Sequence, residues 1–430
     1  MRRFFRARCL RPSVATAGSI NSPATIERPG SQTVQRHSVC WAAALVASLA
    51  VGSGGVTRAA DVAFDGFGGG DWGVATNWST DNLPTSDDVA VFGSDISNAT
   101  IFLEADRAVA GLRFTNTGTT DLLGSIGTTG TGFILSLGSG GIVIDSGAGV
   151  VSIGGTSGSP ANPQRIGLTL TASQSWTNNS SPSLAAPITF FRGQGAPGTG
   201  SNLDLGTHTL TFTGPGVTEL RGGATGGGSI VKQGTGTLLL GNDKTFTGGV
   251  QLDAGALGLI NGTVLGTGTL TLNGGTIFSS AAARTLANAS VWNGDFSVAD
   301  PSGTSALNLT LSGPATLTGI RTVTVGDAAT VFAVGAMGES GGSFGLVKEG
   351  VGTLSLPEVS TYSGNTAVNT GGLVIGSVGS LPGWETAGRY SVASGGFLAF
   401  GDAVTDSEVS TIRGTGNLAA GSSIGFSTTA

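Results

Sequence analysis

Residues 232–260 read KQGTGTLLLGNDKTFTGGVQLDAGALGLI, and residues 348–376 repeat this stretch, 116 positions later and without a gap, as KEGVGTLSLPEVSTYSGNTAVNTGGLVIG. The two copies keep apolar residues at alternate positions. Leu238 and Leu240 correspond to Leu354 and Leu356, while the residue between them changes from leucine to Ser355. A period of two is the signature of a β-strand with one buried face. We therefore expect Leu238 and Leu354 to point inward and the middle residue to point outward.

Glycines stand at the same offsets in both copies, between the predicted strands. Glycine at fixed places between strands marks turns that need positive φ or a close approach of two backbones. We treat the shared positions as the structural residues of the repeat. They are Lys232, Gly234, Gly236, Leu238, Leu240, Gly248, Gly255 and Leu257 in the first copy, and Lys348, Gly350, Gly352, Leu354, Leu356, Gly364, Gly371 and Leu373 in the second.

Shorter relatives of the repeat occur elsewhere in the chain. Residues 266–272 repeat residues 234–240 at an offset of 32, and residues 205–212 and 307–313 are looser versions. Short strands of this kind recur from about residue 108 to the end, with hardly a stretch that favours an amphipathic helix. Repetition over tens of residues, all strand and turn, predicts a β-solenoid in which each coil stacks on the next. A β-sandwich or propeller is the alternative fold, but it gives no reason for near-identical units.

The composition is unusual for a folded protein. The chain has 430 residues, of which 76 are glycine and only 11% are charged, and it has three lysines. Such a glycine content is typical of low-complexity segments. However, 39% of the residues are hydrophobic and follow a pattern, whereas disordered chains combine low hydrophobicity with high charge. The sequence therefore predicts a folded protein rather than a disordered tail.

Residues 1–59 differ from the rest and predict an export leader. Residues 1–60 hold 8 of the 20 basic residues and one acid, so the remainder has 12 basic and 25 acidic residues, a net charge of −13. The apolar run 39–51 is too short to span a bilayer and fits the hydrophobic region of a signal peptide, with cleavage after Ala59. Both cysteines, Cys9 and Cys40, lie in this leader, so no disulfide framework is expected in the mature chain.

The repeat resembles the autotransporter-associated β-strand repeat, also called the passenger-associated transport repeat. That family's pattern is a lysine, then Gly-x-Gly-Thr-Leu-x-Leu, then an aromatic residue before glycine, and finally Gly-x-Leu. Phe246 and Tyr362 supply the aromatic position of the two copies. The resemblance implies an exported bacterial protein with a right-handed parallel β-helix, at the cell surface, associated with the outer membrane, or secreted. Membrane barrels that close such proteins have alternating strands, a pattern that residues 425–430 do not show. We therefore expect either a fragment cut in mid-solenoid, which the abrupt end favours, or a protein that uses another export route.

The expected organisation has three parts. Residues 1–59 form the export leader, residues 60–107 an N-terminal capping module, and residues 108–430 an all-β solenoid. The capping module contains Trp72 and Trp78, which we expect to close the first coil, because solenoids need a cap. The alternative is that the two rings form a platform on which a sugar stacks.

Motifs that carry chemistry are scarce. Residues 193–198 contain a literal G-x-G-x-x-G, but turn and strand residues follow it, whereas a dinucleotide site needs a helix there. His208 is the only histidine of the mature chain and aligns with the glycines at 236 and 268, in a turn. With no cysteine and no second histidine, neither a zinc site nor a catalytic triad is expected there.

Acidic residues give the remaining candidates. Asp87 and Asp88 with Asp95, or Asp61, Asp65 and Asp71, are oxygen donors of the kind that calcium prefers, but no EF-hand or nonapeptide pattern surrounds them. We therefore expect these acidic residues to be structural residues of turns rather than calcium ligands.

The sequence thus predicts a non-catalytic structural or adhesive surface protein without a cofactor. Its expected partners are extracellular glycans or cell-surface components, and the export machinery through the leader. Nucleic acid is not expected, because the mature chain is acidic. The alternative is a carbohydrate-active β-helix enzyme or a glycan-binding protein.

Overall fold

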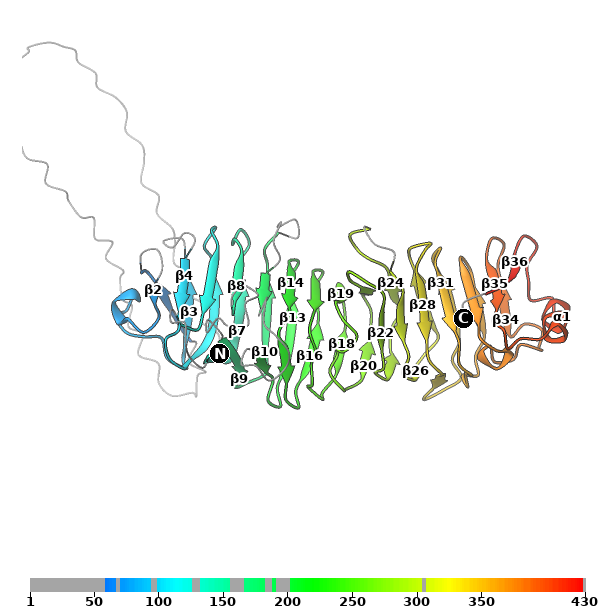
Figure 1. Cartoon of the computed structure of the whole chain (residues 1–430), viewed down its shortest axis with the longest axis horizontal. Helices are drawn as coiled ribbons and strands as arrows, with labels where there is room; N and C mark the ends of the chain where they lie inside the picture. Colours follow the sequence, from blue (N-terminus) through cyan, green and yellow to red (C-terminus); the bar gives the residue numbers. More distant parts are fainter. Residues whose placement is uncertain are drawn as a thin grey trace, which may run out of the picture. The chain divides into compact units, whose positions relative to one another are not determined.

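The computed structural model describes residues 59–66, 70–93, 99–125, 132–154, 166–181, 188–190, 202–303 and 307–427. The export leader and the G-x-G-x-x-G stretch lie outside these residues. The described residues belong to one unit, which begins at Thr57. Its strands stack one behind another along a single axis (Figure 1). Every named strand pair is parallel.

The described strands form three sheets. The first sheet contains β1 (Ala60–Phe64), β3 (Asp88–Phe92), β5 (Arg107–Phe114), β7 (Phe133–Ile144), β9 (Ile166–Leu170), β10 (Gln174–Asn178), β12 (Asn202–Asp204), β13 (Thr209–Thr213), β15 (Gly223–Thr225), β16 (Ser229–Lys232), β18 (Val250–Leu252), β20 (Leu270–Leu272), β23 (Ser290–Trp292), β26 (Ala315–Leu317) and β29 (Met337–Glu339). The second contains β2 (Gly70–Asp71), β4 (Ala99–Phe102), β6 (Thr120–Leu123), β8 (Val151–Ile153), β11 (Ile188–Phe190), β14 (Val217–Leu220), β17 (Thr237–Leu240), β19 (Ala256–Leu259), β21 (Thr276–Ser279), β24 (Phe296–Val298), β27 (Arg321–Val325), β30 (Leu346–Glu349), β32 (Thr366–Val368) and β34 (Tyr390–Val392). The third contains β22 (Arg284–Leu286), β25 (Leu309–Leu311), β28 (Val331–Val334), β31 (Thr353–Leu356), β33 (Gly372–Ile375), β35 (Phe397–Phe400) and β36 (Ser423–Phe426).

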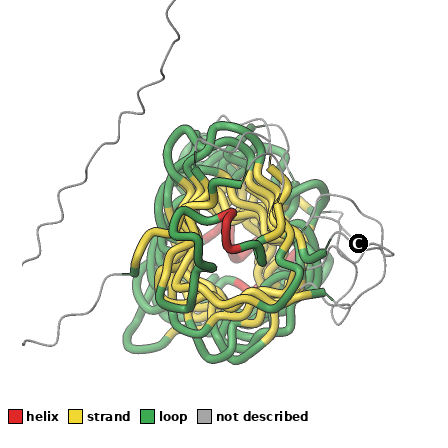
Figure 2. Tube along the Cα trace, turned by 90° about the vertical axis from the view of Figure 1, so that its left-hand side faces the viewer, coloured by secondary structure: helices red, strands yellow, loops and turns green. Residues whose placement is uncertain are grey.

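Consecutive coils place equivalent residues one above another. Ile230 pairs with Val250, Val250 with Leu270, and Leu270 with Ser290, so these coils are 20 residues long. Viewed along the axis, strands surround a common centre (Figure 2). Backbone hydrogen bonds therefore run along the axis and inward side chains form continuous ladders. The predicted parallel β-helix is confirmed.

The predicted inward and outward positions are also confirmed. In β17, Leu238 and Leu240 are buried while Thr237 and Leu239 remain partly exposed. In β31, Leu354 and Leu356 are buried while Thr353 and Ser355 remain partly exposed. The inward residue of each coil stacks on the inward residue of the next: Phe332 pairs with Leu354, Leu354 with Leu373, and Leu373 with Leu398.

The two copies of the repeat lie on different sheets. In the first copy β16 belongs to the first sheet and β17 to the second, whereas in the second copy β30 belongs to the second and β31 to the third. The match at an offset of 32 is likewise not a structural equivalence, because Leu270 pairs with Val250 and not with Leu238. The motif encodes a tight turn followed by a half-buried strand, and different corners of the coil use it.

Aromatic side chains fill the N-terminal coils. The rings of Trp72 and Trp78 lie 4.8 Å apart, and both side chains are buried together with Phe64 and Phe92. The indole N–H of Trp78 donates to the carbonyl oxygen of Trp72 at 2.9 Å. Neither ring is accessible, so the sugar-platform alternative is wrong, and the two rings fill the first coils.

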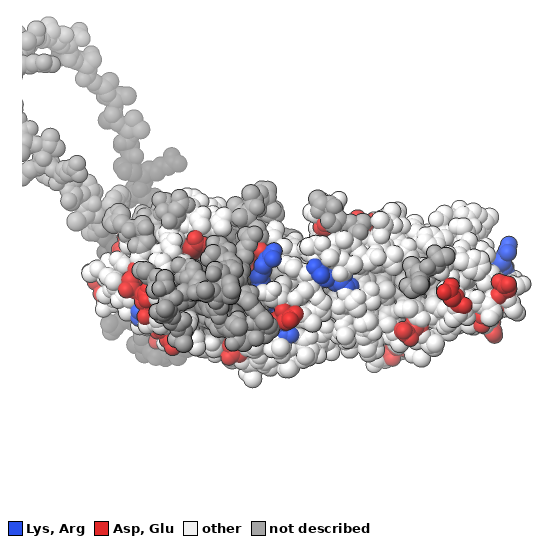
Figure 3. All heavy atoms as spheres, in the orientation of Figure 1, with Lys and Arg blue, Asp and Glu red and all other residues white. Residues whose placement is uncertain are grey.

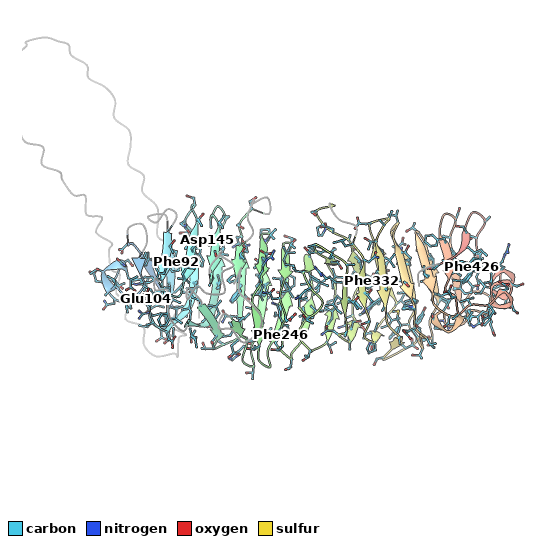
Figure 4. The ribbon with its side chains drawn as sticks, in the orientation of Figure 1. Phe92, Glu104, Asp145, Phe246, Phe332 and Phe426 are labelled. Atoms are coloured by element: carbon cyan, nitrogen blue, oxygen red, sulfur yellow. The ribbon has the colours of Figure 1, made fainter. Side chains whose placement is uncertain are left out.

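Residues 60–107 share the main sheets with the rest. β1 and β3 occupy the first two places of the first sheet, and β5 and β7 follow them. Phe92, labelled in Figure 4, stacks on Phe114 of β5 at 5.0 Å between ring centroids. Further along, Trp292 packs on Phe296 and on Phe332, which Figure 4 also labels. The hydrophobic core is thus continuous along the axis.

An α-helix that the repeat analysis did not predict lies near the C-terminal end. α1 (Asp406–Gly414) begins at the N-cap Thr405, whose hydroxyl accepts from the Glu408 backbone N–H, while the Glu408 carboxylate accepts from the Thr405 N–H. This capping box satisfies otherwise unpaired backbone groups. Val409 and Ile412, three positions apart, are buried.

Two short 3₁₀ helices complete the described elements, η1 (Ala75–Asn77) and η2 (Val378–Ser380). Within the described part of the chain, no helix is long and apolar enough to cross a membrane.

The ladder geometry predicts how damage spreads. A carboxylate at the buried position of Leu354 has no partner, so Leu354→Asp should destabilise its coils by about 3–5 kcal/mol. Each coil contacts mainly its neighbours, so unfolding should stay local. In limited proteolysis we expect the first cuts between residues 340 and 380, while the coils around Leu238 stay resistant.

Ser355→Asp provides the matched control, because this neighbouring side chain points outward. It should change stability by no more than about 0.5 kcal/mol and digest like the parent. Simultaneous digestion of the whole Leu354→Asp chain would contradict stacking of nearly independent coils.

Candidate functional site

The lysine that opens each repeat holds two neighbouring coils together. In the first copy the ammonium of Lys232 donates to the carbonyl oxygens of Gln233 at 2.6 Å and Gly234 at 3.0 Å. It also donates to the carbonyl oxygen of Ala254 at 3.2 Å. Gln233 and Gly234 form the turn that follows β16, and Ala254 lies in the turn directly above, which follows β18. The side chain is 2% exposed. We call this arrangement a lysine clamp.

The second copy builds the same clamp with different neighbours. Lys348 donates to the carbonyl oxygens of Glu349 at 2.9 Å and Gly350 at 2.7 Å in its own turn. It reaches the carbonyl oxygen of Thr370, in the next coil, at 3.2 Å. The two sets of partners correspond position by position over 116 residues. The structure therefore explains why the lysine is repeated. Its ammonium group donates hydrogen bonds to carbonyl oxygens that converge where two turns stack.

The third lysine of the sequence follows the same principle. Lys244 is buried and donates to the carbonyl oxygens of Gly222 at 2.6 Å and Gly241 at 2.7 Å. These residues again belong to two adjacent coils. The equivalent position in the second copy is Ser360, whose hydroxyl accepts from the Met337 backbone N–H at 3.4 Å. We did not assign this role to Lys244 from the sequence, although a lysine in a nearly lysine-free chain was a usable signal.

Glycines of the repeat allow the clamped turns to stack closely. Gly255 has φ +70°, and a Cβ there would lie 2.4 Å from the carbonyl oxygens of Gly234 and Gly236. Gly371 has φ +64° and the same conflict with Gly350 and Gly352. Gly248 and Gly364 face equally close backbone atoms of the preceding coil, at 2.4 and 2.2 Å. No other residue fits these places without moving one coil away from the next.

Opposing effects set the protonation of the clamps. Carbonyl oxygens favour the charged ammonium, whereas burial disfavours it. Burial prevails and lowers the pKa of Lys232 and of Lys348 to about 8, and that of Lys244 to about 7. The inward leucines of both repeats, including Leu257 and Leu373, are buried and belong to the hydrophobic core.

The described residues that the sequence offered as candidates for catalysis or metal binding do not lie together in one site. His208 lies in a turn, half-buried, and stacks in register with Gly228 and not with Gly236, which occupies another corner. The expected alignment of His208 with Gly236 is therefore wrong, for the same reason as the offset of 32. The expected alignment with Gly268 is confirmed, because the backbone register continues from His208 through Gly228 and Gly248 to Gly268. Asp88 accepts from the backbone N–H and the hydroxyl of Thr85, at 2.9 and 2.7 Å, which makes it a turn acid. Asp95 lies outside the described residues.

Charge is sparse on the described surface. On the face shown in Figure 3, most atoms are uncharged and the charged side chains form small separate groups. The described residues include no group of three or more His, Cys, Asp or Glu that could hold a metal ion. Several acids bind neighbouring turns instead. Asp253, for example, accepts from the side-chain amides of Gln233, Gln251 and Asn273, at 3.0, 2.8 and 2.6 Å, and these hydrogen bonds hold its pKa below the usual value.

A small groove lies on the outward face of the second sheet. Its volume is about 290 Å³, and it crosses β14, β17 and β21. The apolar part of its lining comes from Leu239, which is partly exposed, and from Phe278, which is 7% exposed. The residues after β21 and β24 form a wall that includes Ala281 and Asp300. The sequence did not indicate this site, because its residues are distant in the chain and only the stacking of coils unites them.

The clamps generate a prediction on stability. Lys232→Met removes three hydrogen bonds and leaves buried carbonyl groups without this partner, so it should cost about 2–3 kcal/mol. Lys348→Met should cost a similar amount, and the double variant should show the sum to within about 0.5 kcal/mol, because the clamps share no coil. Urea unfolding followed by circular dichroism measures these differences. Thr271→Met, on an outward position, is the control and should stay within about 0.5 kcal/mol of the parent. If the clamp variants were as stable as this control, the clamps would contribute little to the free energy of unfolding.

The pKa values predict a rise in stability with pH. In the folded chain Lys232 and Lys348 lose their protons near pH 8, whereas in the unfolded chain they keep them up to pH 10.5. Between these values unfolding takes up protons, so the free energy of unfolding increases as the pH rises. We expect a higher Tm at pH 9.5 than at pH 7, and a smaller increase in the double Lys232→Met, Lys348→Met variant. Above about pH 11 the trend should reverse, because the unfolded lysines have by then lost most of their protons, while burial raises the pKa of Tyr362 to about 12 and so makes the folded chain the more protonated state. A parent Tm that falls from pH 7 to pH 9.5 would contradict the assignment.

The comparison with known proteins finds a family match at the two segments that contain the lysine clamps of Lys232 and Lys348. The Passenger-associated-transport-repeat family model matches residues 230–259 and 346–375, which contain both repeat lysines and their carbonyl partners. The adhesin BmaC autotransporter of Brucella suis biovar 1 (strain 1330) is 34% identical over 261 residues. This alignment covers 58% of the present chain and 6% of the relative, so the chain spans a small fraction of that protein's length. No solved structure matches the chain. The chain therefore carries two passenger-associated transport repeats and is a passenger-like protein distantly homologous to an autotransporter adhesin.

Proposed function

We propose that this chain is a non-catalytic part of an exported surface protein, a β-helical stalk that presents its outer face to extracellular glycans or cell-surface components. The observation that carries the proposal is the pair of lysine clamps within the matched repeats. They use the chain's most strongly repeated residues to join coils, not to build a reactive centre. A stalk of stacked coils suits a passenger that must hold a surface away from the cell.

The alternative is a carbohydrate-active β-helix enzyme. Glycoside cleavage needs two carboxyl groups that face each other across the substrate. The described acids with several hydrogen bonds are engaged in turns, as Asp253 is. Another is Glu339, whose carboxylate accepts from the Ser363 hydroxyl at 2.5 Å, from the Phe344 N–H at 2.6 Å and from the Ser363 N–H at 3.0 Å. Such bonds keep a carboxylate ionised, as their lowering of the pKa of Glu339 indicates, whereas a general acid needs a raised pKa. This favours the structural role.

Surface exposure and attachment test the proposal in the bacterium that encodes the chain. Brief protease treatment of intact cells should release peptides from residues 60–430 and none from a cytoplasmic control protein. Deletion of the gene should lower attachment to a glycan-coated surface severalfold, and the intact gene should restore it. Hydrolysis of polysaccharides by the purified full chain, or unchanged attachment together with no released peptides, would overturn the proposal.

A further inference from the structure

The two repeats differ in what they place on the outer face. Leu239 corresponds to Ser355, and Phe278, two coils above Leu239 in the same outward column, corresponds to Ala399. Both copies keep the same inner leucines and the same clamp, so these two features do not require a large apolar residue at the position of Leu239 or of Phe278.

A glycine brings these two side chains together. Between them in the column lies Gly258, and a Cβ at that position would stand 2.5 Å from Cδ2 of Leu239 and 2.6 Å from Cζ of Phe278. The corresponding residue of the second copy is Val374, which would not fit under this pair. The missing side chain lets Leu239 and Phe278 close over the backbone as a continuous apolar floor of the groove.

The wall of the groove contains a strained residue. Ala281 has φ +69°, a left-handed conformation that costs a non-glycine residue about 1–2 kcal/mol. It lines the groove together with Pro301 and with the hydroxyl groups of Ser280 and Ser302. Asp300 adds a carboxylate, which the Ser302 hydroxyl approaches at 2.7 Å. Strain of this kind persists where the surrounding structure holds it, and it concentrates at binding sites.

We infer that this groove is a binding subsite for one or two neutral sugar rings of a polysaccharide, an inference that rests on the proposed surface function. A sugar ring has an apolar C–H face and a rim of hydroxyl groups, which match the apolar floor and the hydroxyl-lined wall. The volume of about 290 Å³ lies just below the range of about 300–1,000 Å³ for drug-sized ligands, which suits one or two sugar rings. Asp300, together with the net charge of −13 outside residues 1–60, disfavours acidic sugars.

Titration calorimetry with the purified full chain tests the inference, using cellohexaose and chitohexaose as neutral probes and oligogalacturonate as the acidic probe. At least one neutral probe should bind, and the acidic probe should bind at least tenfold more weakly. Leu239→Ser, which copies the second repeat, should weaken neutral binding at least tenfold without a change in the circular dichroism spectrum. Ser355→Leu, at the matched position, should leave binding unchanged.

Several outcomes would overturn the subsite. These are no binding of either neutral probe, binding that Leu239→Ser leaves intact, preferential binding of the acidic probe, or self-association of the chain that Leu239→Ser abolishes. The last outcome would assign the groove to a second copy of this chain. Attachment of cells is measured independently. If attachment depends on the gene while neither neutral probe binds, the subsite is wrong and the surface function stands.

Discussion

The structure depends on the close stacking of each turn on the turn of the preceding coil, because neighbouring coils of a parallel β-helix contact each other at their turns as well as along their strands. Stacked turns bring carbonyl oxygens together, and these groups repel one another unless a donor lies between them. The ammonium groups of Lys232 and Lys348 supply that donor, each with three carbonyl partners from two coils. Gly255 and Gly371 make the approach possible, since a side chain there would collide with the turn below. Lysine and glycine thus act as one unit.

This use of lysine affects the rest of the surface. A chain with only three lysines places all of them inside, so its outward chemistry comes from hydroxyl groups, amides and a few acids and arginines. Amide and carboxylate side chains then stack along the axis, as Asn273 does on Asp253 at 2.6 Å. Such contacts satisfy polar groups at the edges of the sheets without forming a concentrated charge. This surface is mostly uncharged and varies locally along the axis, as the groove at Leu239 shows.

Different elements bury apolar side chains near the two ends of the described residues. At the N-terminal end Trp72 and Trp78 pack edge to face with Phe64 and Phe92 beside them. Near the C-terminal end α1 buries Val409 and Ile412, and the Tyr390 hydroxyl donates to the Ile412 carbonyl oxygen at 3.1 Å. Aromatic rings and a short amphipathic helix thus bury apolar side chains at these two places, and β36 continues the third sheet beyond β35.

The sequence by itself determined the class of the fold, the inward and outward positions of the repeat and the turn glycines, because period-two alternation and fixed glycine spacing are local properties of the chain. The capping box of α1 was equally local, and Thr405 and Glu408 would have revealed it. Only the tertiary structure decided which corner each motif occupies, since coil lengths vary and the same turn fits several corners. It alone placed Ala254 above Lys232 and joined Leu239, Phe278 and Ala281 into one groove. Those contacts cross coils, and their register follows from backbone pairing along the axis, which no single stretch of sequence encodes.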